Sequence, residues 1–156
     1  MNYDRYTNIK FDENYHMFLF LSKGPKGTLP KLIVYSPLKD LEDGYNLGFG
    51  TIKINPDGKE YLDGDEISDN GDRDKILATI AYTVFTFISN YPDKKVYLSG
   101  SDKIRTRLYQ MAINHAFEEL SEKLLIFGDV SDQPDVFDLQ LFERGVNYTG
   151  FVVQKK

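Results

Sequence analysis

The residues best suited to chemistry lie in the segment 96–109. A short apolar run there passes through Ser99, Gly100 and Ser101 into a helical pattern that carries Arg105 and Arg107. Backbone N–H groups at a helix N-terminus lack partners within the helix, and the helix dipole favours negative charge there. We therefore predict an anion-binding site made by these five residues. The alternative is a tight strand-to-helix connection whose arginines pair with nearby acids.

Few other residues are suited to catalysis or metal binding. The sequence contains no Cys, which excludes disulfides, thiolate nucleophiles and thiolate metal ligands. Its two histidines, His16 and His115, are too few to hold a metal without outside ligands, and we assign both to structural roles. No nucleotide-binding glycine loop and no serine-hydrolase elbow occurs. We predict no catalytic residue, no metal ligand and no cofactor.

Charge is concentrated in two segments. Residues 57–74 hold eight acidic and two basic residues, whereas residues 94–107 hold five basic residues and Asp102. The acidic loop could bind Ca²⁺ through its carboxylates, but it lacks the ligand order of an EF-hand, so we predict a solvated loop. The net charge of -5 argues against a dedicated nucleic-acid binder, although nucleic acid is not excluded.

The N-terminus and the apolar segments also bear on location. The first residues contain no apolar run of signal-peptide length. No segment approaches the roughly 20 apolar residues that a membrane-spanning helix needs. Together with the absence of Cys, these features predict a cytoplasmic protein with no membrane partner.

Apolar periodicity predicts the elements that must position these residues. An i, i+3, i+4 stripe indicates a helix over residues 75–89, and a second helix begins at Ser101 or Asp102 and runs to about 123. Residues 57–74 form a long loop, with a short strand at 60–62 as an alternative. Other apolar or alternating segments predict strands or extended chain at 15–22, 31–36, 45–54, 95–98, 124–127, 136–142 and 150–154.

This order predicts the fold class. We expect one α+β domain over residues 1–156, with a mixed sheet of about five to seven strands and two main helices on one face. The order is βββαβαβ followed by C-terminal extended strands, and it resembles the ribonuclease-H-like topology. A nuclease of that fold needs converging carboxylates to hold two metal ions. The first strand and the body of the first helix supply none, so we predict no nuclease site.

Three segments also resemble a known family. They are residues 68–81, residues 100–113 and the C-terminal stretch 142–151. They look like the corresponding parts of a family of small bacterial (Bacteroidetes-type) proteins of unknown function. The resemblance implies a bacterial, single-domain cytoplasmic protein, and it brings no catalytic residue with it.

Two function classes follow. We predict a non-catalytic interaction protein that binds a protein partner, a second copy of itself or a small anionic ligand. Exposed tyrosines among Tyr3, Tyr6 and Tyr15 would then form a partner-binding patch. The alternative is an enzyme or accessory factor that acts on a phosphate-bearing or nucleic-acid substrate at the segment 99–107. The sequence favours the first class and does not decide whether the protein is an enzyme.

Overall fold

The computed structural model describes residues 4–64 and 69–156. The chain separates into two compact units. The N-terminal unit comprises Asn2–Tyr35 and Gly48–Phe87, and the C-terminal unit comprises Ser36–Leu47 and Ile88–Lys156. The single domain expected over residues 1–156 stays a prediction.

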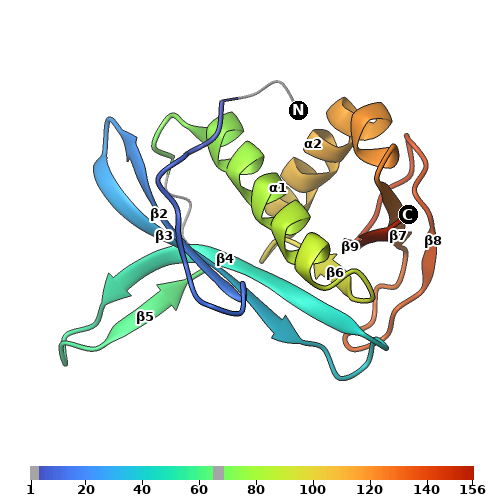
Figure 1. The fold of residues 1–156 in the computed structure, drawn as a ribbon, viewed down its shortest axis with the longest axis horizontal. Coiled ribbons are helices and arrows are strands. Elements are labelled where there is room, and N and C mark those ends of the chain that lie inside the picture. The colour runs from blue at the N-terminus through green and yellow to red at the C-terminus, as the bar shows by residue number, and fades with distance from the viewer. Residues whose placement is uncertain (1–3, 65–68) are drawn as a thin grey trace. The chain divides into compact units, whose positions relative to one another are not determined.

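The described residues form nine strands and two helices, joined by turns and loops (Figure 1). In chain order they are β1 (Lys10–Phe11), β2 (Met17–Gly24), β3 (Gly27–Pro37), β4 (Gly44–Ile54), β5 (Glu60–Asp63), α1 (Arg73–Asn90), β6 (Lys95–Leu98), α2 (Lys103–Ser121), β7 (Leu124–Asp129), β8 (Leu139–Leu141) and β9 (Gly150–Lys155). The hydrogen-bonded strand order is β1-β2-β3-β4-β6-β9-β7-β8, and β5 pairs with β4.

The N-terminal unit is built on antiparallel pairs. β1 pairs with β2, and β2 pairs with β3 from Met17 opposite Val34 to Gly24 opposite Gly27. The last residues of β4 pair with β5, with Ile54 opposite Glu60. Successive side chains of a strand point to opposite faces, so this register sorts the residues of the unit into two faces.

One face of these strands packs against α1. Phe18 and Phe20 of β2 are each 1% exposed. The Tyr35 ring stacks on Phe87 of α1 with centroids 4.4 Å apart, and the hydroxyls of Tyr35 and Thr83 share a hydrogen bond of 2.9 Å. This buried aromatic face is the core of the unit. Burial of each large apolar side chain there stabilises the fold by about 1.5–3 kcal/mol. Figure 1 shows α1 running along these strands.

The C-terminal unit places the last strand of the chain between two earlier ones. β6 runs parallel to the beginning of β4, and β9 pairs antiparallel with both β6 and β7. β8 pairs with β7, and α2 packs against β7. Val96, Phe151 and Val152 are fully buried there.

The predicted fold class is wrong. The chain has a mixed sheet of nine strands with two helices, rather than an α+β sheet of about five to seven strands in the predicted order. β1 contains only two residues, too few for a period-two pattern to identify, whereas β5 corresponds to the alternative strand at 60–62 and β8 lies within the predicted extended segment 136–142. Long-range pairing to neighbouring strands stabilises them, and periodicity carries no information about it.

The ribonuclease-H-like topology is also not supported. Strands joined by a crossover helix are usually neighbours in a sheet. Here β9, from the end of the chain, lies between β6 and β7 and pairs with both.

Candidate functional site

The predicted anion turn lies in the C-terminal unit, and Thr106 closes it. The hydroxyl oxygen of Thr106 accepts from the Gly100 N–H at 2.9 Å, and the same hydroxyl donates to the Asp102 carbonyl oxygen at 2.9 Å. Thr106 itself is buried. The Gly100 N–H, one of the expected anion donors, is thus occupied by a side chain of α2.

Asp102 occupies the donors at the start of α2. It is the N-cap residue, and its carboxylate accepts from the Arg105 N–H at 2.8 Å. The Arg105 guanidinium donates to Asp102 at 2.6 Å and to the Ser101 hydroxyl at 2.8 Å. A carboxylate of the chain therefore sits where a helix N-terminus favours an anion. The expected capping by Ser101 or Asp102 is confirmed for Asp102.

The structure brings four of the five predicted site residues together. Ser99, Gly100, Ser101 and Arg105 lie around the turn, whereas Arg107 lies exposed two residues further along α2, which is about half a helical turn. A methyl group at Gly100 would lie 2.4 Å from the Arg105 Cβ and from the Thr106 nitrogen. The turn therefore needs glycine because the helix backbone approaches it closely. The anion site stays a prediction, and its chief competitor is the Asp102 carboxylate.

Two tyrosines near this turn have a raised pKa. Burial raises the pKa of Tyr109 on α2 to about 12, and the nearby Arg105 opposes that shift. Burial also raises the pKa of Tyr97 on β6, against a hydrogen bond with Ser99. Both phenols are held in the neutral form, which suits packing and gives no general base at neutral pH.

A second site lies on the face of the N-terminal unit opposite α1. We call this surface the open face. The strand register places Leu19 opposite Leu32 and Leu21 opposite Pro30 on β2 and β3. On β4 and β5 it places Ile52 opposite Leu62. The apolar members of the open face are Met17, Leu19, Leu21, Pro30, Leu32, Val34, Ile52, Ile54 and Leu62.

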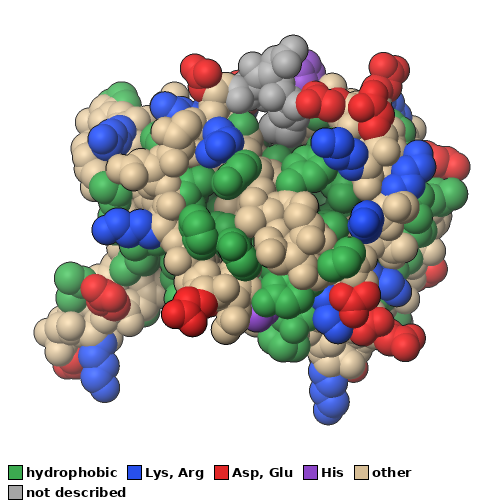
Figure 2. Space-filling model, viewed as in Figure 1, with side chains coloured by type: hydrophobic (Ala, Val, Ile, Leu, Met, Phe, Trp, Pro, Cys, Tyr) green, Lys and Arg blue, Asp and Glu red, His purple; other side chains and the backbone are tan. Residues whose placement is uncertain are grey.

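Several of these side chains are exposed although they lie on a regular sheet. Met17 is 44% exposed, Leu21 46%, Ile54 69% and Leu62 38%. The described part of the N-terminal unit contains one helix, α1, and α1 packs on the face of the sheet opposite the open face. The open face is thus a contiguous apolar surface left to solvent. At the end of the β4–β5 hairpin, at the lower left, Figure 2 shows apolar, basic and acidic side chains together.

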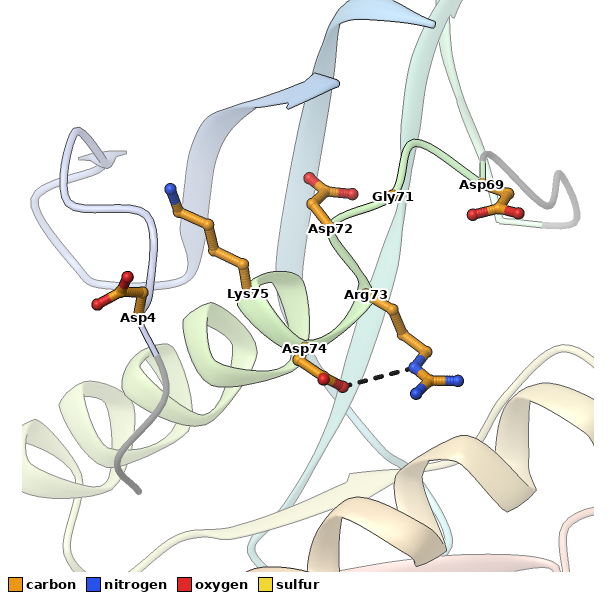
Figure 3. Close-up of a pocket in the computed structure, with 7 residues that line it drawn as sticks. All are labelled: Asp4, Asp69, Gly71, Asp72, Arg73, Asp74 and Lys75. Carbon is orange, nitrogen blue, oxygen red and sulfur yellow. Dashed lines mark ion pairs between the residues drawn. The ribbon is translucent and has the colours of Figure 1, made fainter. Parts of the chain in front are cut away.

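A polar hollow of about 590 Å³ lies at the N-terminus of α1. Its lining residues are Asp4, Asp69, Gly71, Asp72, Arg73, Asp74 and Lys75. Figure 3 shows that their side chains point in different directions, with the Arg73 guanidinium paired to Asp74 at 3.5 Å. No common point is reached by several of these groups, so the hollow lacks the convergent geometry of an active site.

Asp72 in this hollow is used for structure. Its carboxylate accepts from the Tyr6 hydroxyl and from the Ser22 hydroxyl, the latter at 2.6 Å. Asn70, itself buried, donates to Ser22 at 3.1 Å. Burial, followed by the hydrogen bond to Asp72, raises the pKa of Tyr6. This network ties the N-terminal segment and β2 to the start of α1.

The remaining candidates have structural or surface roles. The His16 ring lies 5.8 Å from Phe87, and His115 is exposed on α2. In residues 4–64 and 69–156, no group of three metal-ligating side chains occurs. Asp65 and Glu66 of the acidic loop lie outside the described residues, as does Tyr3 of the predicted tyrosine patch. Tyr6 is engaged by Asp72, and Tyr15 stacks on Phe11 at 5.3 Å.

A family model matches residues 2–156 of the chain. The chain belongs to DUF6934, a family of unknown function. This confirms the resemblance to an uncharacterised family, while bacterial origin stays a prediction. No curated protein and no solved structure matches the DUF6934 chain. Among its described helices, none is long and apolar enough to span a bilayer.

Sequence reasoning missed the open face, although the sequence carries its signal. Residues 17–21 are all apolar, so β2 is apolar toward both faces of the sheet. A strand with one face in water normally alternates apolar and polar residues, and an unbroken apolar run indicates that both faces are covered. Only one face of β2 is covered by α1, so the run predicts a partner for the other.

Proposed function

We propose that this DUF6934 chain is a non-catalytic interaction protein whose open face binds a protein partner. The observation that carries the proposal is the contiguous apolar surface on β2–β5, where Leu21, Ile54 and Leu62 are exposed on regular strands. Soluble monomers seldom expose such surfaces, and those that do use them for binding. We extend the proposal to a cytoplasmic location, which the absence of Cys supports.

The composition of the open face fits a protein rather than a small ligand. Its centre holds aliphatic side chains, and its charged members, Lys10, Lys23 and Glu60, lie toward the outer strands. Protein interfaces have such an apolar centre and polar rim. Small-molecule sites are instead concave and carry a few convergent polar groups, which the open face does not offer.

Site-directed photo-crosslinking in cells that naturally contain the protein tests this proposal. A photoreactive residue at Leu21 should give a protein adduct, and the same residue at Glu13, which is exposed outside the open face, should give none. The crosslinked protein, once purified, should bind the Leu21→Ser variant about tenfold more weakly than wild type, the effect of losing a buried interface side chain. Absence of a Leu21 adduct, or equal binding of the variant, would disprove the proposed function.

The second candidate function uses the turn before α2. An enzyme or accessory factor for a phosphate-bearing substrate would need the Asp102 carboxylate to leave the donors of Arg105. The exposed Arg107 favours this alternative, because it could contribute a charge-assisted hydrogen bond to an arriving phosphate. A phosphate-dependent rise in melting temperature that Arg107→Ala abolishes would support it.

A further inference from the structure

We infer that the partner of the open face is a second copy of this chain, packed face to face through β2–β5 about a two-fold axis. The inference rests on the proposed function and names its partner. It comes from the positions of two charged residues at the borders of the open face, Lys23 on β2 and Glu60 on β5.

Lys23 and Glu60 lie in one row across the strands. Lys23 is opposite Thr28 of β3, and Ile54 of β4 is opposite Glu60. Where β3 leads into β4, the Leu38 N–H donates to the Gly44 carbonyl oxygen at 2.8 Å, and further along the pair the Lys31 ammonium donates to the Thr51 hydroxyl at 2.6 Å. In the antiparallel register that this backbone bond sets, Thr28 lies opposite Ile54. The row therefore runs Lys23, Thr28, Ile54, Glu60, with opposite charges about 14 Å apart at three strand spacings.

The neighbouring row is apolar throughout. Leu21 is opposite Pro30, and Ile52 is opposite Leu62. The same register, two residues along each strand from Thr28 and Ile54, places Pro30 beside Ile52. Four apolar side chains thus cross the sheet next to the charged row.

A two-fold axis parallel to the strands, between β3 and β4, exchanges the two borders of the open face. Lys23 of one copy then faces Glu60 of the second copy, and Glu60 faces Lys23, so both pairs are attractive. In the next row Leu21 faces Leu62 of the second copy. Sheets that pack face to face keep their strands within about 30° of each other, and closed two-fold dimers are the commonest oligomers.

Both charged side chains are available for such pairs. Within residues 4–64 and 69–156, neither Lys23 nor Glu60 makes a side-chain hydrogen bond or ion pair, and both residues are exposed. On the other face of β4 and β5, by contrast, Lys53 pairs with Asp63 at 3.2 Å inside the chain. Lys53 and Asp63 thus neutralise each other within one copy of the chain. Lys23 and Glu60 can instead pair with the oppositely charged residue of a second copy.

Charge-swap variants test the arrangement in solution. Wild type should sediment as a dimer in the micromolar range, and Glu60→Lys or Lys23→Glu should each weaken dimerisation by about ten- to a hundredfold, because two attractive pairs become repulsive. A mixture of Glu60→Lys with Lys23→Glu should form a dimer again, since both pairs across that heterodimer are attractive. Glu13→Lys and Lys39→Glu are controls of equal charge change at exposed positions off the open face, and both should dimerise as wild type does.

Three outcomes would overturn the inference. The first is a wild-type chain that stays monomeric throughout. The second is a dimer that both single variants leave intact, which requires another interface. The third is a dimer that only Glu60→Lys disrupts, which indicates edge-to-edge pairing through β5. If wild type is monomeric but the Leu21 crosslink captures a different protein, the proposed function stands and the second copy is ruled out as partner.

Discussion

The turn before α2 and the open face use their side chains in opposite ways. At the turn, Asp102, Arg105 and Thr106 satisfy one another and the backbone around them. On the open face, Leu21 and Ile54 remain exposed, although the other side of β2 buries Phe18 and Phe20. The turn satisfies its donors within one chain, whereas the open face leaves apolar side chains in solvent, where we propose that another surface binds.

Residue type alone pointed to the turn and not to the open face. The turn has the donors and arginines that an anion site needs. The carboxylate of Asp102, three residues before Arg105, already occupies those donors and competes with an anion. The open face has no reactive group, yet it leaves apolar area in water that burial would stabilise by about 25 cal/mol per Å². What a region leaves unsatisfied is a better indication of binding than what it contains.

Adjacent residues of β2 give the largest expected contrast. Phe20→Ala should lower the free energy of unfolding by about 3–5 kcal/mol, because it leaves a cavity against α1. Leu21→Ala should lower it by less than about 1 kcal/mol in dilute protein, because that side chain is 46% exposed. Urea denaturation of both variants measures these changes. Equal losses would mean that the open face belongs to the folding core, which would contradict its assignment to binding.

The sequence predicted individual elements better than their arrangement. The apolar stripe that predicted a helix over 75–89 corresponds to α1, and the glycine-rich strand over 45–54 corresponds to β4. At Gly50 another backbone approaches closely, since a Cβ there would lie 2.6 Å from the Asp63 carbonyl oxygen. Local periodicity decides such features.

Strand order and the choice of site depended on long-range contacts. Nothing in residues 150–154 indicates that β9 pairs between β6 and β7, because pairing partners are set by tertiary packing. In the same way, the sequence placed Asp102 at a helix cap but could not show that its carboxylate also pairs with Arg105. The anion site stays a prediction, and the engagement of its residues with one another appeared only in the fold.

Alkaline unfolding tests how firmly α2 is packed beside the turn. The pKa of Tyr109 is raised to about 12, so between its ordinary value near 10 and 12 the unfolded chain loses this proton before the folded chain does. The stabilisation is complete below pH 10 and is lost as the pH rises toward 12, by up to about 2–3 kcal/mol at about 1.4 kcal/mol per unit. Urea titrations across this range should show a steeper loss for wild type than for Tyr109→Phe. Parallel pH curves would mean that Tyr109 is solvated.

The smallest expected effect decides between the two uses of the turn. Asp102→Ala should cost about 0.5–2 kcal/mol of stability, because α2 loses its N-cap acceptor. The same change should leave the Arg105 N–H and guanidinium without the carboxylate that occupies them. Inorganic phosphate should then raise the melting temperature of Asp102→Ala but not that of wild type, since in the variant no carboxylate competes for the donors of Arg105.

Asp102→Asn is the matched control for this experiment. Asparagine caps helices about as well as aspartate, so this variant should keep most of the stability while it loses the charge that pairs with Arg105. Its response to phosphate should lie between those of wild type and Asp102→Ala. Stabilisation of wild type by phosphate, lost in Arg105→Ala or Arg107→Ala, would contradict our account of the turn. It would show that the predicted anion site binds phosphate in spite of Asp102.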